Sequence, residues 1–200
     1  LILLVYPVAI PSSLIHKDVF DKNIKVRIVQ PNSSNKKRLA AEKGKQKVID
    51  QILDDLIKFS TLPTEGSPLN LIIWPEVAYP YGLFLSDDKK SLKGKLPYTL
   101  ERYFNRRQIP LLFGGYIKVE NAKSKVYQNT FNSALHFDSF GRLKQYYNKK
   151  YFVPFGEDIP LIGHLKWTQD FFTSTSYFAR GKNYPIFKGP ESSNFITTLC

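Results

Sequence analysis

The sequence is poor in sulfur-containing residues and lacks an ordinary start. Cys200 is its single cysteine, which excludes an internal disulfide and leaves one thiol that could act as a nucleophile. Methionine does not occur among the 200 residues, and the chain opens on Leu1. We therefore expect the sequence to be an excerpt of a longer protein.

A long apolar run is also lacking. Residues 1–10 form an apolar stretch, whereas a helix that crosses a bilayer needs about 20 residues. The stretch has neither the basic start nor the small-residue cleavage site of a signal peptide. It is either a buried strand or the last turns of a transmembrane helix whose beginning is missing. We assign residues 1–24 to a possible helix end and connector.

Acidic residues are scarce compared with basic ones. The chain has 29 Lys and Arg residues against 17 Asp and Glu residues, a formal net charge of +12. Such a balance favours an anionic partner, either nucleic acid or an anionic membrane surface. No zinc-finger spacing, aromatic RNA-binding run or basic heptad array accompanies the lysines. We therefore expect no nucleic acid partner, and either a solvated Lys-rich surface or a face that contacts a membrane.

The residues that are present form the pattern of a folded α/β domain. Hydrophobic residues make up 42% of the chain, which is enough for a packed core. Alternating strand-like and helical segments predict a sheet covered by helices. The predicted strands are 25–30, 69–74, 111–117, 130–137, 142–147 and 195–199, and the predicted helices are 35–59 and 98–107. No linker interrupts residues 25–200, which predicts a single domain.

Three residues that can do chemistry each come after a predicted strand. They are Glu76, Lys149 and Cys200. Glu76 lies at the C-terminal end of its strand, where α/β sheets place reactive groups. Taken singly, each has an ordinary explanation, as a surface carboxylate, a solvent-exposed lysine and a buried core cysteine. Together they can carry acyl transfer: the carboxylate takes the thiol proton, the thiolate attacks an acyl carbon, and the ammonium group stabilises the oxyanion.

The order Glu, Lys, Cys is that of the nitrilase (carbon–nitrogen hydrolase) superfamily. Within this superfamily the chain resembles apolipoprotein N-acyltransferase in four stretches, which are Val26–Asn32, Ile72–Pro80, the segment 132–160 and Arg180–Gly181. The run Y-x-K-x-x-x-V-P-F-G-E-x-x-P from Tyr147 is the most specific, because soluble amidases keep the lysine but not, as a rule, the VPFGE continuation. Departures are Tyr151 and Phe152, where the family usually has a His-like residue and Leu.

The resemblance implies a role for each matching residue. Glu76 resembles the general base, Lys149 the oxyanion lysine and Cys200 the nucleophile, and Glu157 resembles a further essential carboxylate. The spacing to the VPFGE run selects Lys149 rather than the adjacent Lys150. The implied fold is α/β, a nitrilase-like αββα sandwich that is incomplete at the C-terminus, with residues 25–200 as a truncated catalytic domain.

The resemblance also implies a function. A bacterial enzyme of the inner membrane, with its catalytic domain on the periplasmic side, takes an acyl chain from a phospholipid onto the cysteine as a thioester. It then passes the chain to the N-terminal amine of an apolipoprotein. The family needs neither a metal nor a cofactor, and we expect a monomer. Phospholipid, apolipoprotein and membrane are therefore the predicted partners.

Two alternatives stay open. A soluble nitrilase-superfamily amidase would share the three catalytic residues without needing a membrane. A non-catalytic fragment of a split or decayed acyltransferase gene would have no turnover, and we expect little turnover from residues 1–200 alone because the nucleophile is the last residue.

Two geometric expectations follow. The side-chain ends of Glu76, Lys149 and Cys200 should converge to within roughly 3–6 Å, near hydrogen-bond reach for a site without substrate. Several aromatic residues form either a lipid-facing rim or ordinary packing contacts. These are Tyr79, Tyr81, Phe84, Phe171, Phe172, Tyr177 and Phe178.

Overall fold

The structure of the chain is a computed structural model. It describes residues 23–33, 37, 40–41, 43–66, 68–86, 91–120, 127–152, 178–197 and 199. The possible membrane-helix end at 1–24, apart from Asn23 and Ile24, lies outside these ranges, as do Glu157 and Cys200. Within the described ranges, no helix has both the length and the apolar character needed to cross a bilayer.

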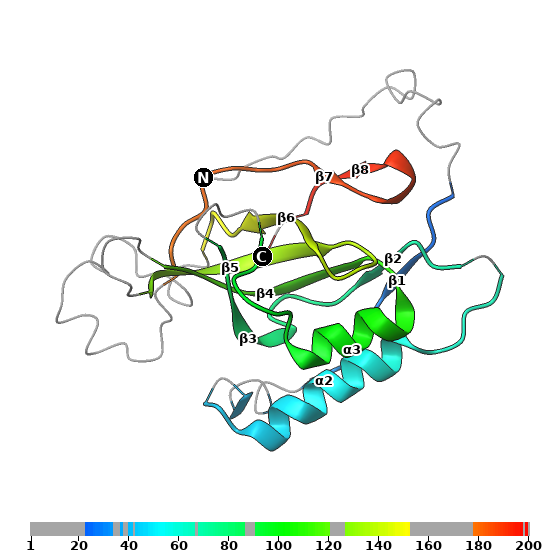
Figure 1. The fold of residues 1–200 in the computed structure, drawn as a ribbon, viewed down its shortest axis with the longest axis horizontal. Helices are drawn as coiled ribbons and strands as arrows, with labels where there is room; N and C mark the ends of the chain where they lie inside the picture. The colour runs from blue at the N-terminus through cyan, green and yellow to red at the C-terminus, as the bar shows by residue number, and fades with distance from the viewer. Residues whose placement is uncertain are drawn as a thin grey trace, which may run out of the picture.

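Six strands form one mixed sheet (Figure 1). They are β1 (Val26–Ile28), β2 (Leu71–Ile73), β3 (Tyr79–Phe84), β4 (Leu111–Glu120), β5 (Tyr127–Phe137) and β6 (Leu143–Asn148). The order is β1-β2-β4-β5-β6, with parallel pairing from β1 to β4 and antiparallel pairing from β4 to β6. Strand β3 also pairs in parallel with β4, beyond the positions that β2 occupies. The link between β2 and β3 therefore lies along the edge of β4.

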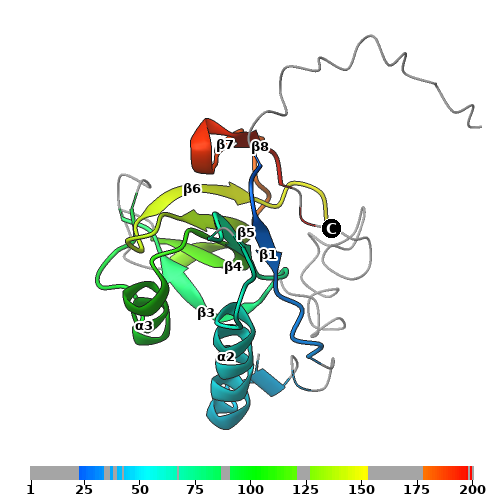
Figure 2. The same cartoon turned by 90° about the vertical axis from the view of Figure 1, so that its right-hand side faces the viewer.

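Two helices cover one face of the sheet, α2 (Gln46–Ser60) and α3 (Tyr98–Arg107) (Figures 1 and 2). The buried face of α2 follows helical spacing, with Ile49, Ile52, Leu53, Leu56 and Ile57 against the core. Each such side chain contributes about 1.5–3 kcal/mol when fully buried. The helix predicted over 35–59 is interrupted, because residues 43–44 form a turn with Gly44 at φ +76°, and α2 begins only at Gln46.

Residues of the strands alternate between two apolar clusters, as the two-residue period of a strand requires. Ile72 and Trp74 belong to the large core beneath the helices, whereas Leu71 and Ile73 belong to a smaller cluster on the opposite face. That opposite face packs against Phe187 of the short antiparallel pair β7 (Phe187–Lys188) and β8 (Asn194–Phe195), which a 3-10 turn, Pro190–Ser192, connects.

The layers therefore run from helices through the sheet to the β7–β8 pair (Figure 2). This order confirms the predicted α/β class, and it is the order in which an αββα sandwich begins. The prediction of a strand over 195–199 was largely wrong, because β8 ends at Phe195 and residues 196 and 197 are not in a strand. Strands β3 and β7 were not predicted.

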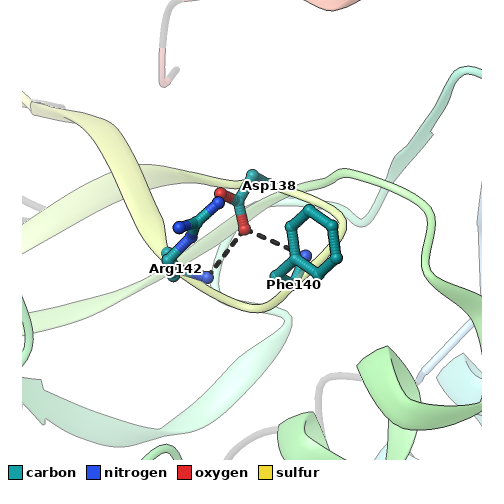
Figure 3. Close-up of polar contacts among 3 residues, drawn as sticks. All are labelled: Asp138, Phe140 and Arg142. Atoms are coloured by element: carbon teal, nitrogen blue, oxygen red, sulfur yellow. Dashed lines mark hydrogen bonds and ion pairs between the residues drawn. The ribbon is translucent and has the colours of Figure 1, made fainter.

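The predicted hairpin around residues 138–141 is present as the connection from β5 to β6. Asp138 organises it: its carboxylate accepts the backbone N–H groups of Phe140 and Arg142, each at 3.0 Å, and the Arg142 guanidinium at 2.9 Å (Figure 3). Burial opposes the charged form, but these donors outweigh it, and the pKa of Asp138 lies below its ordinary value. Gly141 closes the turn at φ +77°.

The structure decides between rim and core for some of the aromatic residues. Tyr79 is fully buried and packs edge-on against Phe113 at 5.7 Å, so for this residue ordinary core packing is the alternative that holds. Tyr81 and Phe84 are half-buried, and Phe178 is half-buried and stacks on Tyr116 at 5.2 Å. Phe171, Phe172 and Tyr177 lie outside the described residues.

Candidate active site

The strand that leads to Glu76 is anchored by Trp74. This tryptophan is 2% exposed and lies edge-on to Tyr103 at a centroid distance of 5.7 Å. Its indole N–H donates to the hydroxyl of Ser60 at the end of α2, at 2.8 Å. Because Trp74 is held on both sides, the chain leaves β2 in a fixed direction, two residues before Glu76.

The backbone around Glu76 adopts a conformation that few sequences tolerate. Val77 has φ +53°, a left-handed value that is costly for a β-branched residue. The N–H of Gly114 in β4 donates to the carbonyl of Pro75 at 3.2 Å. A Cβ at Gly114 would lie 2.6 Å from the Cα of Glu76, so only glycine permits this approach. Strain of this kind is commonly stored at functional sites.

Lys149 is placed by the backbone that follows β6. Its N–H donates to the carbonyl of Asn132 in β5 at 2.8 Å, and its own carbonyl accepts the N–H of Gly181 at 2.9 Å. A Cβ at Gly181 would overlap the carbonyl oxygen of Asn148, so this contact also requires glycine. The Lys149 side chain is 1% exposed, which is unusual for lysine and requires polar partners.

Three side chains from three segments meet on the sheet face opposite the helices. The Nζ of Lys149 lies 3.3 Å from Oε1 of Glu76. The Nδ2 of Asn132 donates to the same oxygen at 2.7 Å. Asn132 and Lys149 alternate with residues of the helix-side core, Phe131 and Tyr146 among them, which places both on the face opposite the helices. The Glu76 side chain is 29% exposed, so the carboxylate retains contact with the surroundings.

The predicted residues are therefore brought together in part. Glu76 and Lys149 fall within the expected 3–6 Å, whereas Cys200 and Glu157 lie outside the described residues, and all four catalytic roles stay predictions. Lys150 points elsewhere, with its ammonium group 4.9 Å from the ring centroid of Tyr184.

Asn132 was not predicted as a site residue. The sequence did contain one signal. Asn132 is a polar residue in a strand, and its position alternates with residues of the helix-side core. This alternation predicts that its side chain is buried on the other face of the sheet.

A cavity of about 110 Å³ adjoins the link that carries Glu76. Ala41, Ile52 and Leu56 form part of an apolar wall, and Gln30 and Asn32 supply polar groups. Glu76 lies in the lining of this cavity, whereas Lys149 and Asn132 do not. Among the described residues, no group of three or more His, Cys, Asp or Glu side chains is arranged to hold a metal ion.

Comparison with curated proteins finds relatives of this chain. A protein of Bdellovibrio bacteriovorus named apolipoprotein N-acyltransferase is 30% identical over 172 residues, which are 84% of this chain and 30% of that protein. One of the same name from Brucella suis is 26% identical over 189 residues, covering 91% of this chain and 33% of that protein. The chain is a homologue of the apolipoprotein N-acyltransferases. It spans about a third of the length of these relatives.

Comparison with solved structures finds a member of the nitrilase superfamily and an amidase. A Saccharomyces cerevisiae member of branch 10 of this superfamily has a TM-score of 0.44 and 18% identity, covering 88% of this chain and 55% of that one. An N-terminal amidase has a TM-score of 0.38 and 18% identity, covering 65% of this chain and 28% of that one. No model of a protein family matches the chain.

Proposed function

We propose that this chain carries the catalytic residues of an apolipoprotein N-acyltransferase, with Glu76 as general base, Lys149 as oxyanion cation and Cys200 as nucleophile. The observation that carries the proposal is the buried Lys149 ammonium group 3.3 Å from the Glu76 carboxylate. A charge in such a position is costly unless it is paired, and it is most useful where negative charge develops during a reaction. Glu157 is assigned the further carboxylate.

In the first half-reaction, the Glu76 carboxylate takes the proton of the Cys200 thiol. The thiolate attacks the ester carbonyl of a phospholipid, and the Lys149 ammonium group stabilises the tetrahedral oxyanion. The oxyanion collapses, the carbon–oxygen ester bond breaks, and the lysophospholipid alkoxide takes the proton from Glu76. The products are a thioester on Cys200 and a lysophospholipid.

In the second half-reaction, the N-terminal amine of an apolipoprotein attacks the thioester carbonyl. Glu76 takes a proton from the attacking nitrogen, and Lys149 again faces the oxyanion. The carbon–sulfur bond breaks, the thiolate leaves, and Glu76 returns the proton to sulfur. Glu76 is acid and base in turn, so one carboxylate serves both half-reactions.

This function places the site at a bacterial inner membrane, on the periplasmic side. Both substrates have lipid tails and reach the enzyme from the bilayer. The net charge of +12 favours an anionic membrane surface. Residues 1–24 are proposed to include the end of a transmembrane helix and a connector to the catalytic domain, residues 25–200, which we propose acts as a monomer.

The test is acyl transfer from labelled phospholipid to a diacylated lipopeptide, with protein purified from the natural gene. Glu76→Gln should lower kcat by about 10²–10⁴-fold, the range for loss of a general acid–base group. Lys149→Met should lower kcat by about 10²–10³-fold, the range for loss of one oxyanion donor. Lys150→Met is the matched control, because Lys150 is the adjacent lysine and points at Tyr184 instead of Glu76. This variant should keep kcat within about threefold of the parent, since surface substitutions have small effects.

Other outcomes would contradict the proposal. Equal losses in Lys149→Met and Lys150→Met would remove the specific role of Lys149. Ammonia release from small amides, without transfer to the lipopeptide, would indicate an amidase instead. Transfer that survives Glu76→Gln would remove the general base.

A further inference from the structure

We propose that Asn132 is a positioning residue that holds the Glu76 carboxylate in its working orientation. The proposal rests on the acyl transfer described above, and it adds a residue that the Glu, Lys, Cys constellation does not contain. Asn132 acts through Glu76 and is not itself assigned a contact with substrate.

The geometry ties Asn132 to both partners of the ion pair. Its side-chain Nδ2 donates to Oε1 of Glu76 at 2.7 Å, and its backbone carbonyl accepts the N–H of Lys149 at 2.8 Å. One residue thus fixes the carboxylate through its side chain and the lysine through its main chain. Because a carboxylate oxygen only accepts hydrogen bonds, the contact also defines which way the amide of Asn132 faces.

Asn132 sits on a rigid support. Strand β5 is flanked by β4 and β6, and Asn132 lies opposite Tyr116 of β4 in the antiparallel register. Its side chain is 1% exposed, so packing restricts its rotamers. By contrast, the ammonium group of a lysine ends a flexible four-carbon chain. The planar amide of Asn132 therefore orients Glu76 more firmly than Lys149 does, and Lys149 supplies the charge.

The choice of asparagine at this position is costly for stability. Its Oδ1 is buried and has no hydrogen-bond partner in the described part of the chain. An orphaned buried acceptor loses its hydration without compensation, and each such group in a native protein calls for an explanation, of which a catalytic role is one. An apolar side chain would avoid the cost but would lose the Nδ2 contact. The cost is explained if that contact serves the reaction.

Two substitutions separate orientation from charge. Asn132→Ala removes the donor, and loss of orientation should lower kcat about 100-fold while KM changes less than threefold, because a misplacement near 1 Å costs about that much. Asn132→Asp keeps the shape but puts a second carboxylate beside Glu76. Two such groups resist double ionisation, so the acid limb of the pH–rate profile should move upward by about one pH unit or more.

Ser133→Ala is the matched control. Ser133 is the next residue of β5, is also fully buried, and donates to Asn148 Oδ1 at 2.7 Å, without touching Glu76. This variant should lose stability comparably but keep kcat and the pH profile. A loss of kcat in Ser133→Ala as large as in Asn132→Ala would mean that β5 packing alone is responsible, and would overturn the proposal.

A second readout does not depend on acyl transfer. The pH at which the ¹³C carboxyl signal of Glu76 titrates, assigned by its loss in Glu76→Gln, should rise in Asn132→Asp and stay in place in Ser133→Ala. If that midpoint does not move in Asn132→Asp, the positioning role is wrong even where acyl transfer is confirmed. If the midpoint moves but the parent protein transfers no acyl group, the proposed function fails and the contact stands.

Discussion

At the residue scale, the site depends on the absence of one side chain. Gly114 lies where the Pro75–Val77 backbone crosses β4, and a Cβ there would meet the Cα of Glu76 at 2.6 Å. The neighbouring Gly115 offers a direct comparison, because a Cβ at that position would meet its nearest atom at 3.4 Å. Two adjacent glycines in one strand therefore serve different purposes.

We predict that Gly114→Ala displaces Glu76 and that Gly115→Ala does not. The first substitution should lower kcat about 100-fold, since a shift near 1 Å suffices for that loss. It should also reduce the free energy of unfolding by about 1–3 kcal/mol, as overpacking does. Steady-state transfer kinetics and denaturant unfolding of both variants measure the two effects. Equal behaviour of the two variants would mean that the close approach at Gly114 has no functional consequence.

At the element scale, the contact between β5 and the β7–β8 pair depends on an uncharged histidine. His136 is 4% exposed and lies edge-on to Phe187 and Phe195 at 6.2 and 5.7 Å. Neither ring nitrogen has a hydrogen-bond partner in the described part of the chain. Burial lowers the pKa of His136; Asp138 opposes this shift and Lys144 adds to it.

Acid should therefore weaken the fold through His136. The unfolded chain binds a proton as the pH falls through about 6.5, whereas the folded chain resists it, so stability is lost as the pH decreases. Between pH 7.5 and 5.5, the free energy of unfolding should fall more in the parent than in His136→Leu. The difference should be up to about 1.4 kcal/mol for each pH unit below 6.5. Urea unfolding at both pH values gives this double difference. An equal loss in parent and variant would show that His136 does not titrate on unfolding.

Some elements of the fold could be predicted from the sequence and others could not. Helix α3 and the β5–β6 hairpin follow local signals, which are an amphipathic run and a turn-forming Asp-Ser-Phe-Gly. Strand β3 was missed because its sequence, Tyr-Pro-Tyr-Gly-Leu-Phe, contains residues that disfavour strands, and only pairing with β4 holds it extended. Strands β7 and β8 have two residues each, too short for any periodic signal.

The residues of the candidate site could likewise be predicted only in part. Glu76 and Lys149 could be predicted because each follows a strand in a motif that resembles a known family. Asn132 could not, since its contact depends on the register of β5 and on the left-handed Val77 that turns Glu76 toward it.

At the scale of the whole molecule, one part of the surface combines positive charge with exposed aromatic residues. Lys150 lies over the rings of Tyr151 and Tyr184, and these tyrosines are 67% and 47% exposed. Tyrosine and lysine together are typical of surfaces at a membrane interface.

We predict that the protein sediments with anionic vesicles and that added salt weakens this association. Each well-placed lysine contributes about 1 kcal/mol of attraction, which salt screens. Vesicles of phosphatidylcholine alone are the control and should bind less at low salt. Equal binding to both kinds of vesicle at every salt concentration would contradict an electrostatic contribution.

We propose that Cys200 carries an acyl group under the control of Glu76 and Lys149. The most direct measurement is intact-mass analysis of the purified protein after brief incubation with a dipalmitoyl phospholipid, before any lipopeptide is added. We expect a mass gain of one palmitoyl group, mapped by peptide sequencing to Cys200, released by hydroxylamine at neutral pH and greatly reduced in Lys149→Met. An acyl group on any other residue, or one that forms equally fast in Lys149→Met, would contradict it.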